Sequence, residues 1–126
     1  MKKANFAISE IAATFLTDRL VCSEDMIPSL GLAKSLTMKP ISSSLPITIK
    51  RDEFIVLGFR GSDSIGTELL YDILGRRVHI DDRTLQFLDG KILDLEVMDI
   101  MHLSGDADSY PLLIAKEAEQ DAAANP

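Results

Sequence analysis

The clearest hydrophobic pattern in the chain is a helical stripe near its start. Its apolar residues recur at spacings of three and four: Ile8, Ile11, Ala12, Phe15, Leu16 and Leu20. This periodicity predicts an amphipathic helix over about residues 9–21. A second stripe (Ile65, Leu69, Leu70, Ile73 and Leu74) follows possible caps at Ser62 and Ser64 and precedes Gly75, a suitable C′ residue. It predicts a central helix over about residues 64–74.

Between and after these stripes the pattern becomes strand-like. Ile47–Ile49 and Glu53–Phe59, separated by the polar turn 50–52, predict an antiparallel hairpin. Val78 and Ile80 predict a further strand. Residues 84–88, the dipeptide Asp89-Gly90 and the alternating run 93–97 predict a second hairpin, with a bulge where the alternation slips at Asp99.

The remaining segments carry turn and cap signals. Ser23 could cap a helical turn, residues 36–46 are rich in Ser and Pro, and Ser109 could cap a short terminal helix. The order of elements has no parallel crossover pattern. It predicts a small single α+β domain over residues 1–120, with an N-terminal helix, antiparallel hairpins in a curved mixed or antiparallel sheet, one central helix and a frayed tail at 121–126.

Composition supports a globular, soluble protein. The 126 residues are 46% hydrophobic and 26% charged, and no apolar run is long enough to cross a membrane. Cys22 is alone, so no internal disulfide forms, and it is expected to be a small buried hydrophobe. Without a secretory apolar segment after Lys2-Lys3, the cytoplasm is the expected location.

Charge bears on the choice of partner. Thirteen Lys and Arg against 20 Asp and Glu give a net charge of −7, which argues against nucleic-acid binding. Acids concentrate between residues 81 and 108, and they favour an interaction surface for a basic protein partner. The candidate surface comprises Asp81, Asp82, Asp89, Asp94 and Glu96. The alternative is an acidic surface that serves only solubility.

The strongest candidate for chemistry is His79 with Asp81, which would share one face of a strand. Such a pair could ligate a metal or exchange protons, but a third ligand, His102 or Cys22, would have to come from elsewhere. The competing interpretation places His79 in solvent and starts a turn at Asp81-Asp82. The loop 58–64 lacks the lysine of a phosphate-binding motif. No catalytic residue, metal or cofactor is therefore assigned.

Two segments resemble the HesB-like family of A-type iron–sulfur carriers. Residues 8–16 (Ile-Ser-Glu-Ile-Ala-Ala-Thr-Phe-Leu) resemble its opening helix, and residues 78–95, which contain Leu-Asp-Gly, resemble its closing segment. The resemblance implies a compact α+β fold with a curved sheet. The family's Gly-Cys-Ser-Gly-like loop and Cys-Gly-Cys tail are missing, so it implies no bound cluster.

Three functions remain as hypotheses. The first is a non-catalytic cytoplasmic binding or adaptor protein, such as an inhibitor or immunity-type protein, with an acidic surface. The second is a metal-binding protein that uses His79, Asp81 and a third ligand. The third is a cysteine-free HesB-like protein with a structural or regulatory role. A homodimer could also form through the exposed edge of the predicted hairpin at 84–98.

Overall fold

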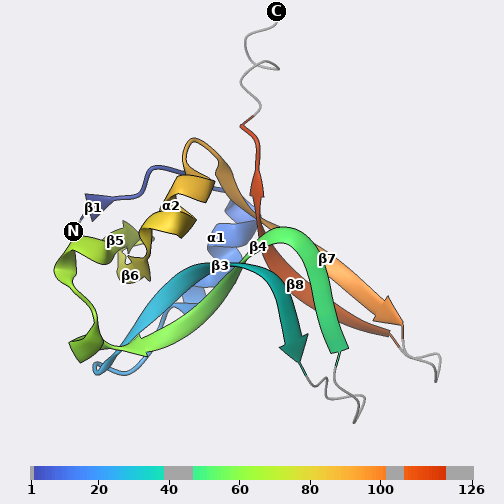
Figure 1. Ribbon diagram of the computed structural model, residues 1–126, viewed down its shortest axis with the longest axis horizontal. Helices are drawn as coiled ribbons and strands as arrows, with labels where there is room; N and C mark the ends of the chain where they lie inside the picture. Colours follow the sequence, from blue (N-terminus) through green and yellow to red (C-terminus); the bar gives the residue numbers. More distant parts are fainter. Residues whose placement is uncertain (1, 39–46, 102–106, 119–126) are drawn as a thin grey trace, which may run out of the picture.

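Eight strands form one curled, mixed sheet in the order β1-β5-β6-β3-β4-β8-β7-β2 (Figure 1). This computed structural model describes residues 2–38, 47–101 and 107–118. The strands are β1 (Lys2–Lys3), β2 (Ala7–Ile8), β3 (Met26–Met38), β4 (Ile47–Gly61), β5 (Leu70–Ile73), β6 (Arg76–Ile80), β7 (Ile92–Met101) and β8 (Ala107–Lys116). The helices are α1 (Glu10–Arg19) and α2 (Asp82–Leu88), and two 3-10 turns are η1 (Ser62–Ser64) and η2 (Thr67–Leu69). The predicted α+β class with a curved sheet is confirmed.

Helix α1 forms where the apolar stripe predicts it. Ser9 caps its N-terminus, and the Ser9 hydroxyl accepts a hydrogen bond from the backbone N–H of Ala12 at 3.2 Å. Ala12, Leu16 and Leu20 are buried. Ile11 belongs to the same stripe but is 54% exposed, so the helix has more apolar surface than the core covers.

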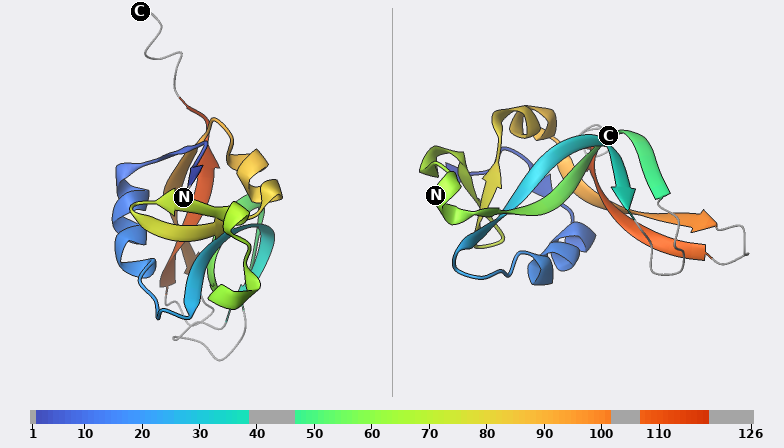
Figure 2. Two further views of the ribbon diagram at one scale, coloured as in Figure 1. Left: turned by 90° about the vertical axis from the view of Figure 1, so that its left-hand side faces the viewer. Right: turned by 60° about the horizontal axis from the view of Figure 1, so that its bottom comes forward.

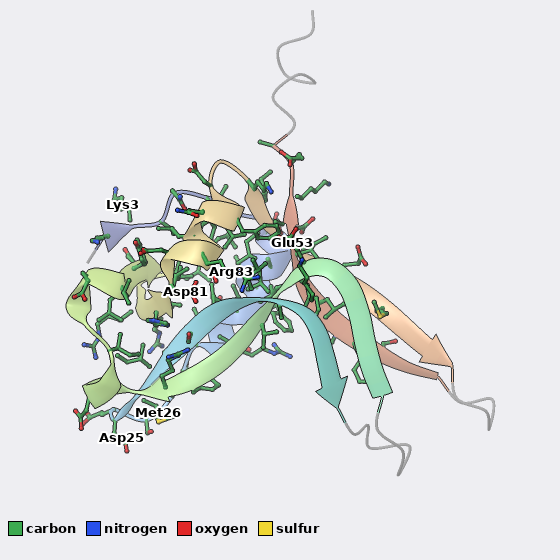
Figure 3. All side chains as sticks on the ribbon, in the orientation of Figure 1. Lys3, Asp25, Met26, Glu53, Asp81 and Arg83 are labelled. Carbon is green, nitrogen blue, oxygen red and sulfur yellow. The ribbon has the colours of Figure 1, made fainter. Side chains whose placement is uncertain are left out.

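The predicted hairpin at 47–59 is wrong, because these residues form the single strand β4. Its partner is β3, which the sequence obscures with Pro28 and Gly31, residues that usually interrupt strands. In place of the predicted turn, the register of β4 against β3 shifts between Lys50, which pairs with Ser35, and Phe54, which pairs with Ala33. Glu53 lies within this irregular stretch of β4 and has a φ of 51°. This irregularity lies where β4 bends, near the label of Glu53 in Figure 3. At Ser23, where a helical turn was expected, residues 23–26 form one hydrogen-bonded turn, in which the N–H of Met26 donates to the carbonyl of Ser23 at 3.0 Å, and β3 follows at once. The first part of the loop expected at 36–46 is wrong, since β3 spans 26–38; residues 39–46 lie outside the described ranges.

The predicted central helix at 64–74 is also wrong. This segment forms η1, η2 and strand β5, and β5 pairs with β6 in an antiparallel hairpin. Leu74 and Gly75 both have positive φ, 53° and 80°, as a two-residue type I′ turn requires. Gly75 therefore does adopt the left-handed conformation expected of it, but in a hairpin rather than after a helix.

A helix stands where the second hairpin was predicted. Residues 82–88 form α2, and Asp81 is its N-cap, accepting a hydrogen bond from the N–H of Thr84 at 2.8 Å. The edge proposed for a homodimer at 84–98 is therefore not formed. Gly90, with a φ of 72°, follows the helix rather than closing a hairpin.

The C-terminal strands differ from the prediction in two respects. Strand β8 replaces the short terminal helix expected from Ser109, and its pairing with β7 is continuous through Asp99↔Ser109, so the bulge is absent. The sheet is mixed, which is one of the two arrangements predicted. Three pairs are parallel: β1 with β5, β2 with β7, and β3 with β6.

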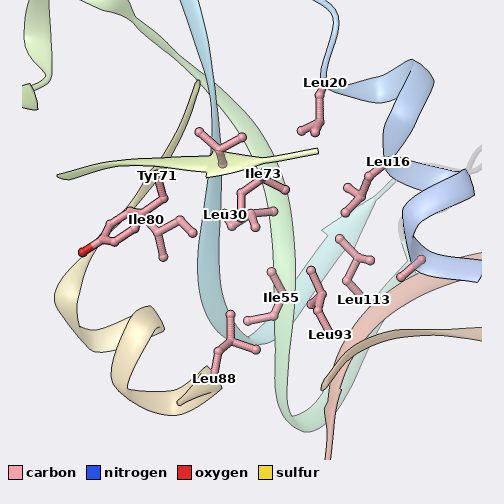
Figure 4. Packing of buried hydrophobic residues seen from close by; sticks show 12 residues of the cluster. Leu16, Leu20, Leu30, Ile55, Tyr71, Ile73, Ile80, Leu88, Leu93 and Leu113 are labelled. Carbon is pink, nitrogen blue, oxygen red and sulfur yellow. The ribbon is translucent and has the colours of Figure 1, made fainter. Parts of the chain in front are cut away.

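The main core lies between α1, α2 and the inner face of the sheet (Figure 4). Leu16 and Leu20 from α1 meet Leu30 and Ile55 from the long strands, and Leu88 contributes from α2. A smaller cluster on the opposite face centres on Phe54 and Leu112. Alternate residues of β4 and β8 therefore serve two different apolar clusters.

The β3/β4 and β7/β8 hairpins extend from the body as two separate arms (Figures 1 and 2). In the described residues, β4 pairs with β8 only at Ile55↔Leu113. From that bridge toward the end of β4 and the start of β8 the two strands diverge, and the space between residues 56–61 of β4 and 107–112 of β8 is called the fork here. Neither α1 nor α2 has the length or apolar character that would let it cross a bilayer, as judged over the described ranges.

Candidate functional site

His79, the strongest chemical candidate in the sequence, is buried rather than exposed to solvent. It is 5% exposed, and its Nδ1 lies 2.8 Å from the Oγ of Ser29 in a hydrogen bond. The two residues are register partners on the parallel strands β6 and β3. This bond joins β3 to the β5/β6 hairpin, and the expectation of a solvent-facing histidine is wrong.

The electrostatic surroundings hold His79 in its neutral form. Burial and the nearby positive charge of Arg60 lower the pKa of His79, and the carboxylate of Asp81 offsets them only in part. Burial raises the pKa of Asp81, but hydrogen bonding to Thr84, together with the charges of His79 and Arg60, brings it below its usual value. Asp81 is therefore an ionised helix cap, not the start of a simple turn.

Thr84 extends the polar contacts of His79 to helix α2, and Ser29, His79, Asp81 and Thr84 together are called the His79 seam here. Its side chain is fully buried, and its Oγ1 accepts a hydrogen bond from the N–H of Leu32 at 3.0 Å. Thr84 thus occupies the place of a strand partner beyond the Leu30↔Ile80 bridge, where β6 ends. Every buried side-chain nitrogen or oxygen in the described ranges has a hydrogen-bond partner. The seam around His79 is fully satisfied, as expected of a structural contact.

A metal site at His79 lacks support from the neighbouring side chains. Within the described part of the chain, no three His, Cys, Asp or Glu residues lie close enough to hold an ion. His102, a possible third ligand, lies outside that part. Cys22, the other one, is exposed rather than buried, and its thiol donates to the carbonyl of Met26 at 3.3 Å.

The five acids of the candidate surface occupy different parts of the fold. Asp81 and Asp82 lie at the start of α2 and Asp89 at its end (Asp81 is labelled in Figure 3), whereas Asp94 and Glu96 lie on β7. Asp94 accepts hydrogen bonds from the Ser9 hydroxyl at 2.6 Å and from the N–H of Leu95 at 2.8 Å. The Ser9 contact is the main reason that the pKa of Asp94 is lowered. Asp81 and Asp94 thus both take part in capping a helix.

Exposed apolar side chains and a concave surface occur together beside α1. A pocket of about 240 Å3 lies between α1 and the fork of β4 and β8, and a shallower one adjoins it, with Phe15 lining both. We call the two together the α1 groove. Its lining residues are Glu10, Ile11, Thr14, Phe15, Arg19, Phe54, Ile55, Val56, Leu57, Leu95, Pro111, Leu112 and Leu113.

Exposed apolar side chains continue from the α1 groove in two directions. Val97, two residues after Leu95 on the same face of β7, is 58% exposed. Phe59, two residues after Leu57 on the same face of β4, is 46% exposed. The right-hand view of Figure 2 shows the β7/β8 hairpin running on beyond the end of α1. Contiguous apolar surface of this kind marks binding sites more often than isolated exposed residues do.

The charges that border the α1 groove are mainly acidic. Glu10 lines it, and exposed Asp18 lies on the same face of α1 as Phe15 and Ile11. Arg19 also lines it, but its guanidinium stacks on the Phe15 ring at 3.8 Å and donates to the Phe15 carbonyl at 2.9 Å. The described residues around the groove thus present the carboxylates of Glu10 and Asp18 and the guanidinium of Arg19, which already contacts the Phe15 ring.

The sequence places Ile11 and Phe15 in the apolar stripe of the predicted helix, but it did not identify the α1 groove. Only the position of the fork, formed by strands nearly sixty residues apart, could have shown it. Comparisons of the chain with models of protein families, with characterised proteins and with solved structures found no match.

Proposed function

We propose that this chain is a non-catalytic binding protein, of the adaptor, inhibitor or immunity type, that takes up an apolar and basic segment of a partner protein in the α1 groove. The observation that carries the proposal is the groove itself, where apolar side chains stay uncovered beside Glu10 and Asp18. An apolar floor supplies affinity, and the carboxylates at the rim select a partner of opposite charge.

The chemistry around His79 favours this function over catalysis. Ser29, His79 and Asp81 are residue types that could act together on a substrate, but Ser29 and His79 are buried and bonded to each other, and Asp81 caps α2. A nucleophile must reach its substrate, and a general base must reach the proton that it removes. Binding needs neither.

The acidic residues near α2 remain an alternative contact surface for the same function. Asp82 and Asp89 are exposed, although Asp89 accepts a hydrogen bond from the Asn5 side chain at 3.1 Å. A cytoplasmic location is a compatible proposal, and a cysteine-free HesB-like protein with a structural or regulatory role is an alternative one. Neither is needed for the binding function.

Affinity purification from the source cells at low salt tests the proposal with matched variants. Ile11→Asp places a charge in the α1 groove, and Val21→Asp is its control, because the two side chains are 54% and 55% exposed and Val21 lies outside the groove lining. We expect a basic protein that wild type and Val21→Asp retain, that Ile11→Asp loses and that salt releases. Equal retention by Ile11→Asp would contradict the groove.

Asp82→Lys separates the two surfaces. If the α1 groove is the contact, this reversal at the start of α2 leaves retention of the basic partner unchanged at moderate salt. If Asp82→Lys releases the partner while Ile11→Asp does not, the acidic residues near α2 form the contact instead.

A further inference from the structure

The outward edge of β4 at Leu57 and Phe59 has no strand beside it in the described chain. On its other edge β4 pairs with β3, and among the residues that the structure describes it meets β8 at the single position Ile55↔Leu113. After that bridge β8 turns away. The ladder that Ile55 begins therefore stops after one register position.

The direction of the backbone groups along β4 follows from Pro28. Pro28 lies opposite Phe59 and has no N–H, so this pair cannot be the hydrogen-bonded kind in the antiparallel ladder. Pairs alternate along a ladder, so Leu57, opposite Leu30, is non-hydrogen-bonded as well. The N–H and C=O groups of Leu57 and Phe59 therefore point away from β3, into the fork.

Two contacts elsewhere in the sheet agree with this assignment. Ile55, in the same alternation, pairs with β8 on the fork side. Leu32, opposite Ile55, sends its N–H to Thr84, away from β4. The backbone N–H and C=O groups of β4 are thus oriented to bond with a further strand that lies in the fork.

The edge of β8 that faces the fork offers fewer backbone hydrogen bonds to an added strand than the edge of β4 does. Pro111, opposite Val97, lies two residues from Leu113 and also lacks an N–H. A strand that enters the fork can therefore bond more completely to β4 than to β8. Its alternate side chains would face Phe15 and Leu57 in the α1 groove.

We infer that the β4 edge at Leu57 and Phe59 is a strand-addition site, at which an extended segment of a basic protein continues the sheet. This inference rests on the proposed function and specifies how the partner binds. The backbone edge requires an extended chain, the pocket requires apolar side chains at alternate positions, and Glu10 and Asp18 favour flanking lysines or arginines. Arg60 does not oppose them, because alternation places it on the other face of β4 from Leu57.

The probe is a synthetic peptide, Lys-Lys-Val-Thr-Val-Thr-Val-Lys-Lys, called the VT peptide here. Its binding is measured by isothermal titration calorimetry against the full chain. Phe59→Pro removes the outward N–H without touching the β3 ladder, and Phe59→Ala removes the ring but keeps that N–H. We expect Phe59→Pro to weaken binding by about tenfold or more and Phe59→Ala by about threefold or less.

Two N-methylated peptides supply a test that leaves the protein unchanged. N–H groups alternate in direction along a strand, so methylation of the valine amides and methylation of the threonine amides block opposite edges. We expect one of the two sets to abolish binding and the other to preserve it. Equal effects of both sets, or no binding of the VT peptide to the wild-type chain, would overturn strand addition.

The outcomes also separate this inference from the proposed function. If Phe59→Pro and Phe59→Ala weaken binding equally while Ile11→Asp abolishes it, the groove binds through side chains and strand addition is wrong. If Ile11→Asp binds the peptide as wild type does, the groove itself is not the site.

Discussion

Pro28 on β3 lies directly opposite Phe59 on β4. Because proline has no N–H, this one pair determines which residues of β4 bond to β3 and which point into the fork. Leu57 and Phe59 face the fork, while Gly58, opposite Ser29, bonds to β3. The relationship links an unremarkable proline to the open edge of the α1 groove.

This alternation predicts opposite responses to proline at neighbouring positions. Phe59→Pro should change the free energy of unfolding by less than about 1 kcal/mol, since the N–H it removes is not part of the β3–β4 ladder. Gly58→Pro should cost about 2 kcal/mol or more, because it removes a ladder bond and leaves the Ser29 backbone without its partner. Urea unfolding of both variants measures the difference, and similar stabilities would refute the assignment.

The His79 seam predicts a pH-dependent stability. Because the pKa of His79 is lowered in the folded state from about 6.5, the unfolded chain binds more protons when the pH falls through that value. Stability is therefore complete above pH 6.5 and decreases as the pH drops toward the folded-state pKa. Unfolding should require less urea at pH 5 than at pH 7.5.

One variant assigns this effect to His79. His79→Gln should reduce the difference between the two pH values, because it removes the group whose pKa burial lowers. The lowered pKa values of Asp81 and Asp94 act at lower pH, below the ordinary aspartate value of 3.8, so they do not enter this window. An unchanged difference in His79→Gln would rule out the buried neutral histidine as its source.

Thr84 should matter through its hydroxyl. Thr84→Val keeps the shape but leaves the N–H of Leu32 without its acceptor, which should lower the free energy of unfolding by about 1–3 kcal/mol. Thr84→Ser keeps the hydroxyl and loses one methyl group, with a cost near 1 kcal/mol. Thermal unfolding should rank Val below Ser, and the reverse order would show that packing outweighs the hydrogen bond.

Ser9 and Asp94 should act as a unit. Ser9→Ala removes the cap of α1 and should cost about 1 kcal/mol. Because Asp94 accepts from the same hydroxyl at 2.6 Å, the effect of Asp94→Ala should shrink once Ser9 is absent. A double-mutant cycle measures the coupling, and strictly additive effects would show that the contact contributes nothing to stability.

The parts of the fold that sequence predicts are those that depend on local signals. Helix α1 follows from an apolar period and the cap at Ser9. Strand β3 could not be predicted, since Pro28 and Gly31 are compatible with a strand only through the long-range partners β4 and β6. In α2, the stretch from Thr84 to Leu88 is too short for its period to separate helix from strand, and the cap by Asp81 decides between them.

The α1 groove could not be predicted from the sequence for a related reason. His79 and Asp81 stand out because of their residue types, yet the fold places His79 in a buried, satisfied seam. Phe15 and Leu57 are unremarkable apolar residues, and only the divergence of β4 from β8 leaves them beside an open pocket. The proposed function therefore rests on shape and backbone direction rather than on a reactive side chain.

Binding of an extended peptide in the α1 groove is tested by a map of backbone amide shifts in the 15N-labelled chain during titration with the VT peptide. We expect the largest shifts at Ile11, Phe15, Leu57 and Phe59, along the α1 groove and its β4 edge. Shifts confined to residues 81–89, or no shifts at all, would contradict it.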